Sequence, residues 1–178
     1  IKGQLFLFGT GHNHCLAEEA LHRAGGYANA CPILDKKIDF SYGVKISSKL
    51  ERTSNIANEI LKKFNLQKQD VLIIFSNSGV NKAPIEAAEY AKKIGLKVIS
   101  ITSIKYSKSI KFSKNKKLYK ISDVFIDNKG PIGDSLIKVK NNFNIGTSST
   151  IANSFILNAI FLELANLLKN EKPYPFYL

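Results

Sequence analysis

A loop of small, hydroxyl-bearing residues follows the strongest strand pattern of the chain. The apolar run of residues 71–75 leads directly into Ser76-Asn77-Ser78-Gly79-Val80-Asn81 and then into a helical pattern over residues 83–94. Hydroxyls and unpaired amide N–H groups at a helix N-terminus donate hydrogen bonds to an anion, and the helix dipole favours negative charge there. The segment predicts a phosphate cradle, with a plain Ser/Asn turn as the alternative. It is not a Walker loop, because no Gly-Lys-Ser/Thr is present.

A loop with two histidines, Gly9-Thr10-Gly11-His12-Asn13-His14, follows the apolar run of residues 5–8. Its glycines superficially suggest a dinucleotide fingerprint. We reject that interpretation because the third glycine and an acidic partner at the right distance are both missing. Histidines beside glycines at the carboxyl end of a strand favour acid/base chemistry or contacts to ligand hydroxyls.

His14, Glu18 and His22 follow one another at intervals of four residues, which would place them on one face of a helix. Such a stripe can bind a metal ion, but neither a His-Glu-x-x-His motif nor further ligands accompany it. We therefore favour a solvent-facing, paired helix stripe and expect no metal site.

Two further hydroxyl-rich segments lie at element ends. Thr102-Ser103 closes the strand pattern of residues 97–102, and Gly146-Thr147-Ser148-Ser149-Thr150 opens the last helical pattern. Each alone is typical of a helix cap. Together with the Ser76 loop they predict a pocket rim lined with hydroxyls, which suits a sugar phosphate.

Short apolar runs alternate with longer amphipathic segments along the chain. The pattern predicts strands over residues 5–8, 71–75, 97–102, 124–126 and 136–139, and helices over residues 14–24, 50–64, 83–94 and 151–168. Residues 27–48 show no clear period and are interpreted as a loop with one short element. The alternation indicates an α/β fold, a three-layer α/β/α sandwich of the flavodoxin or Rossmann-like kind with a mostly parallel, five-stranded sheet. Ligands bind outside the carboxyl ends of such strands.

The size and composition favour one soluble domain. The chain has 178 residues, of which 44% are hydrophobic, and we find no apolar run near the length of about 20 residues that spans a bilayer. Cys15 and Cys31 form no disulfide framework and are expected to be small buried residues in a reducing, cytoplasmic setting. The chain begins at Ile1, almost directly in a strand, which suggests that the true N-terminus lies outside it.

The net charge of +12 comes mostly from lysine, because only Arg23 and Arg52 among the 26 basic residues are arginine. Readers of nucleic acid usually depend on arginine. The densest basic stretch, residues 105–120, is interpreted as a solvated loop and helix face, with an electrostatic patch for nucleic acid as the alternative. We expect neither a nucleic-acid nor a membrane partner.

Taken together, these motifs resemble the sugar isomerase (SIS) domain family, in particular its bacterial branch of phosphosugar and phosphoheptose isomerases. The matching segments are collinear and cover almost the whole chain: 8–14, Glu19, 23–26, 48–52, 70–81, 84–86, 98–103, 117–119, 123–128, 133–134 and 147–150. The family's Gly-His-Ser-His loop has Asn13 in place of serine, and its Arg-His before Lys116-Lys117 is absent. The family's first helix and longer tail are also missing, so we interpret residues 1–178 as a single SIS domain without those termini.

The resemblance implies a homodimer and an aldose–ketose isomerase that needs no cofactor. In that reaction a base takes the proton next to the sugar carbonyl, giving an enediol, and an acid/base opens the sugar ring. Glu51 is the expected base, with a first-turn helix acid as its alternative role. Glu19 is the second choice for the base, with an ion pair to Arg23 as its alternative. His12 is expected to open the ring or to contact hydroxyls.

The resemblance also implies which residues hold the ligand, a phosphorylated sugar. The expected binding residues are Gly9, Thr10, Gly11, Ser76, Asn77, Ser78, Gly79, Asn81, Thr102, Ser103, Thr147 and Ser148. Two other functions of SIS domains stay open. One is a sensor that binds a phosphosugar without converting it, and the other is a lyase that cleaves the ether of N-acetylmuramic acid 6-phosphate.

Overall fold

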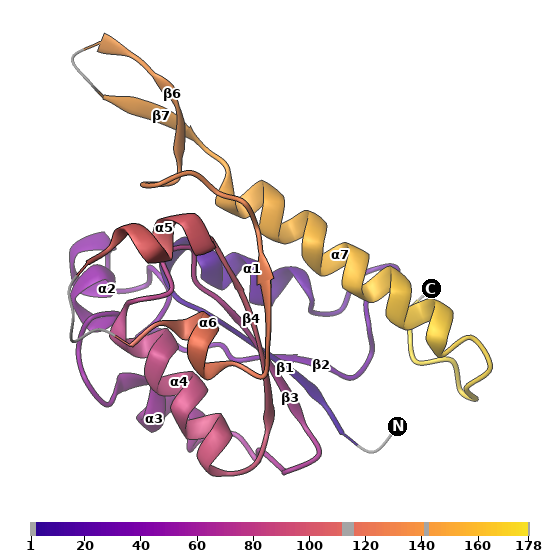
Figure 1. Ribbon diagram of the computed structural model, residues 1–178. Helices are drawn as coiled ribbons and strands as arrows, with labels where there is room; N and C mark the ends of the chain where they lie inside the picture. Colours follow the sequence, from indigo (N-terminus) through magenta and orange to yellow (C-terminus); the bar gives the residue numbers. More distant parts are fainter. Residues whose placement is uncertain (1–2, 112–115, 141–142, 178) are drawn as a thin grey trace.

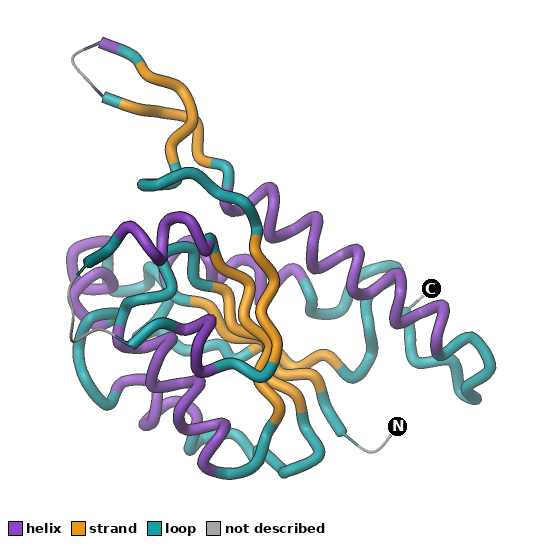
Figure 2. The backbone as a smooth tube through the Cα atoms, in the orientation of Figure 1, coloured by secondary structure: helices purple, strands orange, loops and turns teal. Residues whose placement is uncertain are grey.

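Five parallel strands form the central sheet of the protein (Figures 1 and 2). The computed structural model describes residues 3–111, 116–140 and 143–177. The strand order is β2 (Ala30–Pro32), β1 (Leu5–Gly9), β3 (Val71–Phe75), β4 (Lys97–Thr102) and β5 (Val124–Asp127). Every neighbouring pair runs parallel. The predicted α/β class and five-stranded parallel sheet are therefore confirmed.

Helices cover both faces of this sheet and give three layers. On one face lie α3 (Ile56–Leu61), α4 (Lys82–Lys93) and α6 (Leu118–Ile121), and on the other lie α1 (His14–Glu19) and α7 (Ser149–Leu167). Strand side chains alternate between the two cores, so that Phe8 and Ile74 join the first and Leu7 and Ile73 join the second. The short elements η1 (Gly11–Asn13), α2 (Val44–Leu50) and α5 (Ile104–Ser109) complete the domain.

The strand register brings the carboxyl ends of three strands to the same edge of the sheet. Gly9 of β1 pairs with Phe75 of β3, and Phe75 pairs with Ile101 of β4. The loops that begin at Thr10 and Ser76 therefore start side by side. This edge is where parallel α/β sheets bind their ligands.

The prediction of one continuous helix over residues 50–64 is wrong, because the chain turns within this segment. Helix α2 ends with Glu51 as its C-cap, and α3 begins only at Ile56. Asn55, which precedes α3, has a φ of 71°, a left-handed conformation that asparagine tolerates better than most residues. The turn carries Thr53, Ser54 and Asn55, whose short polar side chains compete with helical hydrogen bonding. Glu51 therefore closes one helix instead of opening another.

The segment predicted as the fifth strand of the sheet forms a separate hairpin. Strands β6 (Ser135–Lys138) and β7 (Asn144–Thr147) pair antiparallel and stand off the body of the domain (Figure 1). The fifth strand of the sheet is instead β2, which lies in the region interpreted as loop and is only three residues long. Its Pro32 is tolerated because β2 is an edge strand.

Helix α7 is long and apolar, with a mean hydropathy of 1.3, and so has the length and composition of a membrane span. The expectation that no apolar run reaches such a length is therefore wrong. In the fold, Leu157 and Phe161 pack into the core beneath β1, β3 and β4. Its outward side leaves large apolar side chains uncovered, with Ile151 76% and Phe155 75% exposed. We call this the α7–hairpin surface; it comprises Leu136, Ile137, Phe143, Ile145, Ile151, Phe155, Leu162 and Leu167, all exposed.

Both cysteines are free thiols, and neither is fully buried as expected. Cys31 is partly buried, whereas Cys15 is exposed. Partial burial raises the pKa of the Cys15 thiol, and the nearby Glu18 carboxylate raises it further. Neither thiol is activated by its surroundings, because burial also raises the pKa of Cys31.

Candidate functional site

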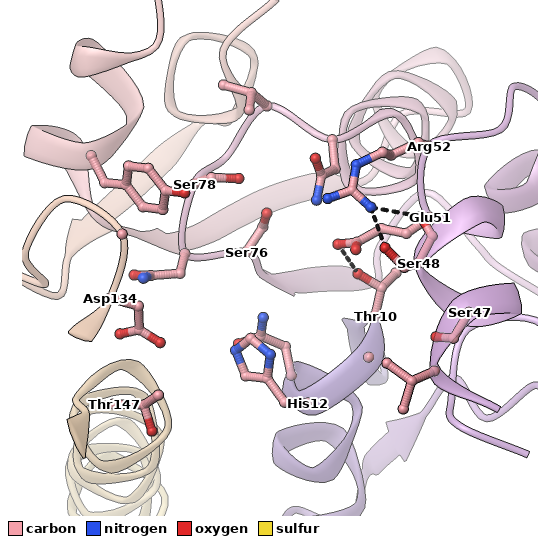
Figure 3. Close-up of a pocket in the computed structure, with 18 of the residues that line it drawn as sticks. Thr10, His12, Ser47, Ser48, Glu51, Arg52, Ser76, Ser78, Asp134 and Thr147 are labelled. Carbon is pink, nitrogen blue, oxygen red and sulfur yellow. Dashed lines mark hydrogen bonds between the residues drawn. The ribbon is translucent and has the colours of Figure 1, made fainter. Parts of the chain in front are cut away.

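A cavity of about 560 Å³ opens at the carboxyl edge of the sheet. It lies between the loops after β1 and β3, the end of α2, and the base of the β6–β7 hairpin (Figure 3). Its lining consists of Thr10, Gly11, His12, Asn13, Phe40, Val44, Ser47, Ser48, Glu51, Arg52, Ser76, Asn77, Ser78, Val80, Asn81, Tyr106, Ile110, Gly133, Asp134 and Thr147. Most of these side chains are polar, so the cavity suits a hydrophilic ligand.

The loop after β3 presents hydrogen-bond donors to this cavity. Ser76, Ser78 and Asn81 line it, and α4 begins directly afterwards. The backbone N–H groups of Ser78, Val80 and Asn81 donate no hydrogen bond to any described residue. Free N–H groups beside a helix N-terminus form an anion site. The structure brings these donors together at one wall of the cavity, and the phosphate cradle itself stays a prediction.

Gly79 allows this loop to turn tightly. Its φ is +62°, a left-handed conformation that favours glycine. A Cβ at this position would lie 2.8 Å from Thr102 Oγ1, which is too close for any side chain. The Gly79 amide donates instead to Ser76 Oγ, 3.3 Å away. Gly79 thus shapes the cradle without lining the cavity.

Several predicted binding residues support the cavity from behind. Thr102 and Ser103 are fully buried, and their hydroxyls donate to the carbonyls of Asn77 and Gly130. Neither residue lines the cavity, and the same holds for Gly9 and Ser148. A Cβ on Gly9 would lie 2.2 Å from the Asn13 carbonyl oxygen, so this glycine permits the close return of the chain after β1. Among the predicted binding residues, the lining comprises Thr10, Gly11, Ser76, Asn77, Ser78, Asn81 and Thr147.

The Glu51 carboxylate is held in place by the loop after β1. Thr10 Oγ1 donates a hydrogen bond of 2.6 Å to Glu51 Oε1, as Figure 3 shows. Its second oxygen, Oε2, has no hydrogen-bond partner among the described residues. The Glu51 carbonyl also accepts the N–H of Ala83 in the first turn of α4, at 3.0 Å. The structure thus fixes a carboxylate with one free oxygen beside the phosphate cradle.

Arg52 gives the cavity its positive charge, and it is the one Lys or Arg among the described residues of the lining. Its Nη1 donates to the carbonyl oxygen of Ser48 at 2.7 Å, which orients the guanidinium at the cavity wall. The sequence placed Arg52 in a family-like segment but gave it no role. Arg52 lies just after α2 and its C-cap Glu51, within the segment predicted as one helix over residues 50–64, so no local pattern linked it to the Ser76 loop.

His12 and the hairpin base form the opposite wall (Figure 3). His12 comes from η1, whereas Asp134 and Thr147 come from the two ends of the hairpin. The sequence gave roles to His12 and Thr147, but it placed Asp134 only in a family-like segment without a role, because that residue lies in a turn far along the chain. His12 Nε2 lies 3.4 Å from Ser149 Oγ at the start of α7.

Glu19, the second candidate for the base, lies outside the cavity lining. It forms an ion pair with Arg23, the alternative role expected for it. The stripe of His14, Glu18 and His22 is also broken, because α1 ends at Glu19 and His22 packs edge-on against Tyr177. His14 pairs with Glu18 at 2.9 Å but is buried, not solvent-facing. Among the described residues, no three His, Cys, Asp or Glu side chains are placed to hold a metal ion.

Four asparagines form a buried chain of amides behind the cavity. Asn128 Nδ2 donates to Asn77 Oδ1 at 3.1 Å and to Asn153 Oδ1 at 2.8 Å, and Asn153 Nδ2 reaches Asn13 Oδ1 at 3.5 Å. Asn77 lines the cavity, and its buried Nδ2 has no acceptor among the described residues. A buried, unpaired amide donor is costly unless a ligand or water completes it. Asn77 therefore leaves one buried amide donor behind the cavity wall without a partner in the described part of the chain.

Comparison with known proteins connects this site to a family. The family model of the SIS domain matches residues 2–103. A UPF0309 protein of Brucella anthropi is 42% identical over 176 residues, and the match covers 98% of this chain and 72% of that protein. A UPF0309 protein of Brucella canis is 40% identical over 176 residues with the same coverage. Among solved structures, E. coli CFT073 c3406 in complex with a sugar phosphate superposes with a TM-score of 0.59 at 17% identity, covering 97% of this chain and 74% of that chain.

The chain belongs to the SIS domain family, as the sequence motifs indicated. The two Brucella relatives, at 40–42% identity to this chain, are UPF0309 proteins. The likeness to the E. coli structure confirms the fold. Family membership and the polar, anion-binding cavity together support phosphosugar binding.

Proposed function

We propose that the protein is an aldose–ketose isomerase of a sugar phosphate, working through an enediol. The observation that carries the proposal is the Glu51 carboxylate, which is held by Thr10 in the same cavity as an arginine and a phosphate-type loop. A base beside an anion anchor is the arrangement that this reaction needs. The E. coli protein of similar fold was solved with a sugar phosphate, which agrees with a ligand of this class.

The phosphate would bind at the start of α4. Free N–H groups after β3, the hydroxyls of Ser76 and Ser78, and the guanidinium of Arg52 converge there. Charge-assisted hydrogen bonds of this kind are about twice as strong as neutral ones.

The proton transfer would use Glu51. Its free oxygen takes the proton from the carbon next to the carbonyl, the electron pair forms the C=C bond of the enediolate, and the carbonyl oxygen is protonated. Returning the proton to the former carbonyl carbon, with loss of the enediol O–H proton, gives the isomeric sugar. The sequence of steps is redox-neutral, so no external oxidant or reductant is needed. His12, on the opposite wall, would move the proton of the ring hydroxyl when the sugar opens.

The test of this proposal is a thermal-shift panel followed by a turnover assay. The panel comprises hexose, aminohexose, N-acetylated hexose, heptose and muramic acid phosphates, with inorganic phosphate and unphosphorylated sugars as controls. A true ligand at about 100 times its Kd stabilises the fold by about 2.7 kcal/mol, a rise of several degrees in Tm. We expect one phosphosugar to exceed phosphate and to be converted to its keto isomer.

The other outcomes of the panel separate the rival functions. Binding without conversion would replace the isomerase by a phosphosugar sensor. Release of lactate from muramic acid 6-phosphate would identify an ether lyase, which begins with the same proton abstraction. No shift beyond that of phosphate itself would count against a phosphosugar site altogether.

We also propose that the protein works in the cytoplasm as a homodimer through the α7–hairpin surface. This surface carries few charges, because Glu163 is the one charged residue within α7 and Lys138 is the one charged residue within β6. Exposed apolar patches of this extent mark interaction sites, and an isolated two-stranded hairpin is marginally stable without further packing. Because this surface carries so little charge, it is complementary to the same apolar surface on a second copy of the chain and not to nucleic acid. Lys117 from the basic stretch, moreover, turns inward and donates to the Ser107 and Ile110 carbonyls.

Phe155→Glu is expected to convert the dimer into a monomer, because it places a charge in the middle of the α7–hairpin surface where the side chain is 75% exposed. Light scattering coupled to size-exclusion chromatography measures the mass directly. Leu34→Glu, at an exposed leucine outside this surface, is the control and should remain dimeric. A wild-type chain that is monomeric at high micromolar concentration would contradict the proposal.

A further inference from the structure

Asp134 makes more hydrogen bonds than a helix cap requires. One oxygen, Oδ1, accepts the backbone N–H groups of Ser149 at 2.8 Å and Ser148 at 3.3 Å, and also the hydroxyl of Ser148 at 3.2 Å. These bonds cap the first turn of α7, where a carboxylate also meets the helix dipole favourably. The other oxygen, Oδ2, accepts the hydroxyl of Ser149 at 2.6 Å. Capping explains the two backbone bonds but not the short bond from the Ser149 hydroxyl.

The bond between Asp134 and Ser149 determines what Ser149 offers to His12. A serine hydroxyl has one hydrogen to donate, and here the short contact to Asp134 Oδ2 uses it. Ser149 is fully buried, so no water competes for this geometry. The oxygen of Ser149 therefore faces His12 Nε2, 3.4 Å away, as an acceptor. His12 must carry its proton on Nε2 to complete the contact.

We infer that Asp134 and Ser149 are positioning residues that fix the tautomer of His12. With the proton on Nε2, the neutral imidazole keeps its lone pair on Nδ1, which is then the basic atom of a side chain that lines the cavity. The role of this tautomer rests on the proposed function, in which Nδ1 takes the proton of the ring hydroxyl when the sugar opens. The two hydrogen bonds between Asp134 and Ser149 and between Ser149 and His12 connect the hairpin base, α7 and η1.

Asp134→Asn separates positioning from capping. The amide oxygen of Asn still accepts the two backbone N–H groups, so the cap is kept. Its NH2 group faces Ser149 Oγ, however, and donates where the carboxylate accepted. The Ser149 hydrogen is then free to turn toward His12 Nε2, which must become an acceptor. His12 should therefore move its proton from Nε2 to Nδ1.

The measurement is ¹⁵N NMR of the three imidazoles at pH 8. Signals are assigned with His14→Gln and His22→Gln. We expect the Nε2–H tautomer for His12 in the wild-type protein and the Nδ1–H tautomer in Asp134→Asn. Ser149→Ala, which removes both bonds, should replace the fixed tautomer by an exchange-averaged signal. Ser154→Ala, a serine further along α7, is the matched control and should leave the His12 signals unchanged.

Turnover provides the second readout. Asp134→Asn is expected to lower kcat by about 100-fold, within the range of general acid–base catalysis, while KM changes by less than a few-fold. An unchanged Nε2–H tautomer in Asp134→Asn would overturn the inference. A tautomer switch in a protein that converts no phosphosugar would uphold the positioning of His12 and contradict the isomerase proposal instead.

Discussion

Glu51→Gln is expected to lower kcat by at least about 1,000-fold while phosphosugar affinity stays within a few-fold of wild type. The amide cannot take a proton from carbon, but its oxygen can still accept the Thr10 hydroxyl that holds the carboxylate in place. The phosphate cradle is untouched by the change. Single-turnover assays give the rate, and calorimetry with the phosphosugar found in the panel gives the affinity.

Glu59→Gln is the matched control for this experiment. Glu59 is an exposed acid on α3 that pairs with Lys37 at the surface, outside the cavity lining. Its replacement should leave both kcat and affinity near wild type. A fully active Glu51→Gln enzyme would falsify the assignment of the base. If Glu51→Gln lost affinity as well as rate, Glu51 would have a role in binding the sugar and not the role of the base.

Arg52→Ala is expected to weaken phosphosugar binding by about 100-fold, because it removes the guanidinium from the cavity wall and leaves only neutral donors around the phosphate. Arg52→Lys should recover part of the affinity, since lysine keeps the charge but lacks the planar fork that matches phosphate. Calorimetric titration with the phosphosugar and, separately, with inorganic phosphate measures both effects.

Arg23→Ala provides the control, because Arg23 is the other arginine of the chain and pairs with Glu19 away from the cavity. Its titration should match that of the wild-type protein. Equal loss for phosphosugar and for phosphate in Arg52→Ala would agree with a phosphate contact. Loss for the sugar alone would move Arg52 to the sugar end of the ligand and contradict its proposed role.

The sheet was predictable because its strands carry strong local signals. The run over Val71–Phe75 is apolar on both faces, as a strand buried between two helical layers must be, and β4 matches its predicted bounds. The hairpin was assigned to the wrong sheet for a physical reason. Residues 136–139 have strand-like side chains, but a local pattern does not encode which partner a strand finds. The short edge strand β2 had too few residues for any period.

The site was predictable where it follows directly from a strand and not where distant segments meet. The loop at Ser76 was predictable because small polar residues directly follow the apolar run of β3. Thr102 was expected to touch the ligand by the same reasoning, but the tight approach of Gly79 turns its hydroxyl onto the Asn77 carbonyl. Asp134 reaches the cavity from the base of the hairpin, and Arg52 reaches it from the turn after α2. The positions of these two side chains depend on tertiary packing, which the local sequence of one segment does not encode.

The main chain of Glu51 ties the two ends of the cavity together. Its carbonyl accepts the Ala83 N–H at the start of α4, while its carboxylate accepts the Thr10 hydroxyl. The span from the anion-binding amides to the carboxylate is therefore set by a few covalent bonds and two hydrogen bonds. Under the proposed function, a sugar held by its phosphate would offer Glu51 whichever carbon lies at that span. The cavity would then select sugars by carbon-chain length, because sugars one carbon longer or shorter would present the wrong C–H bond to the same base.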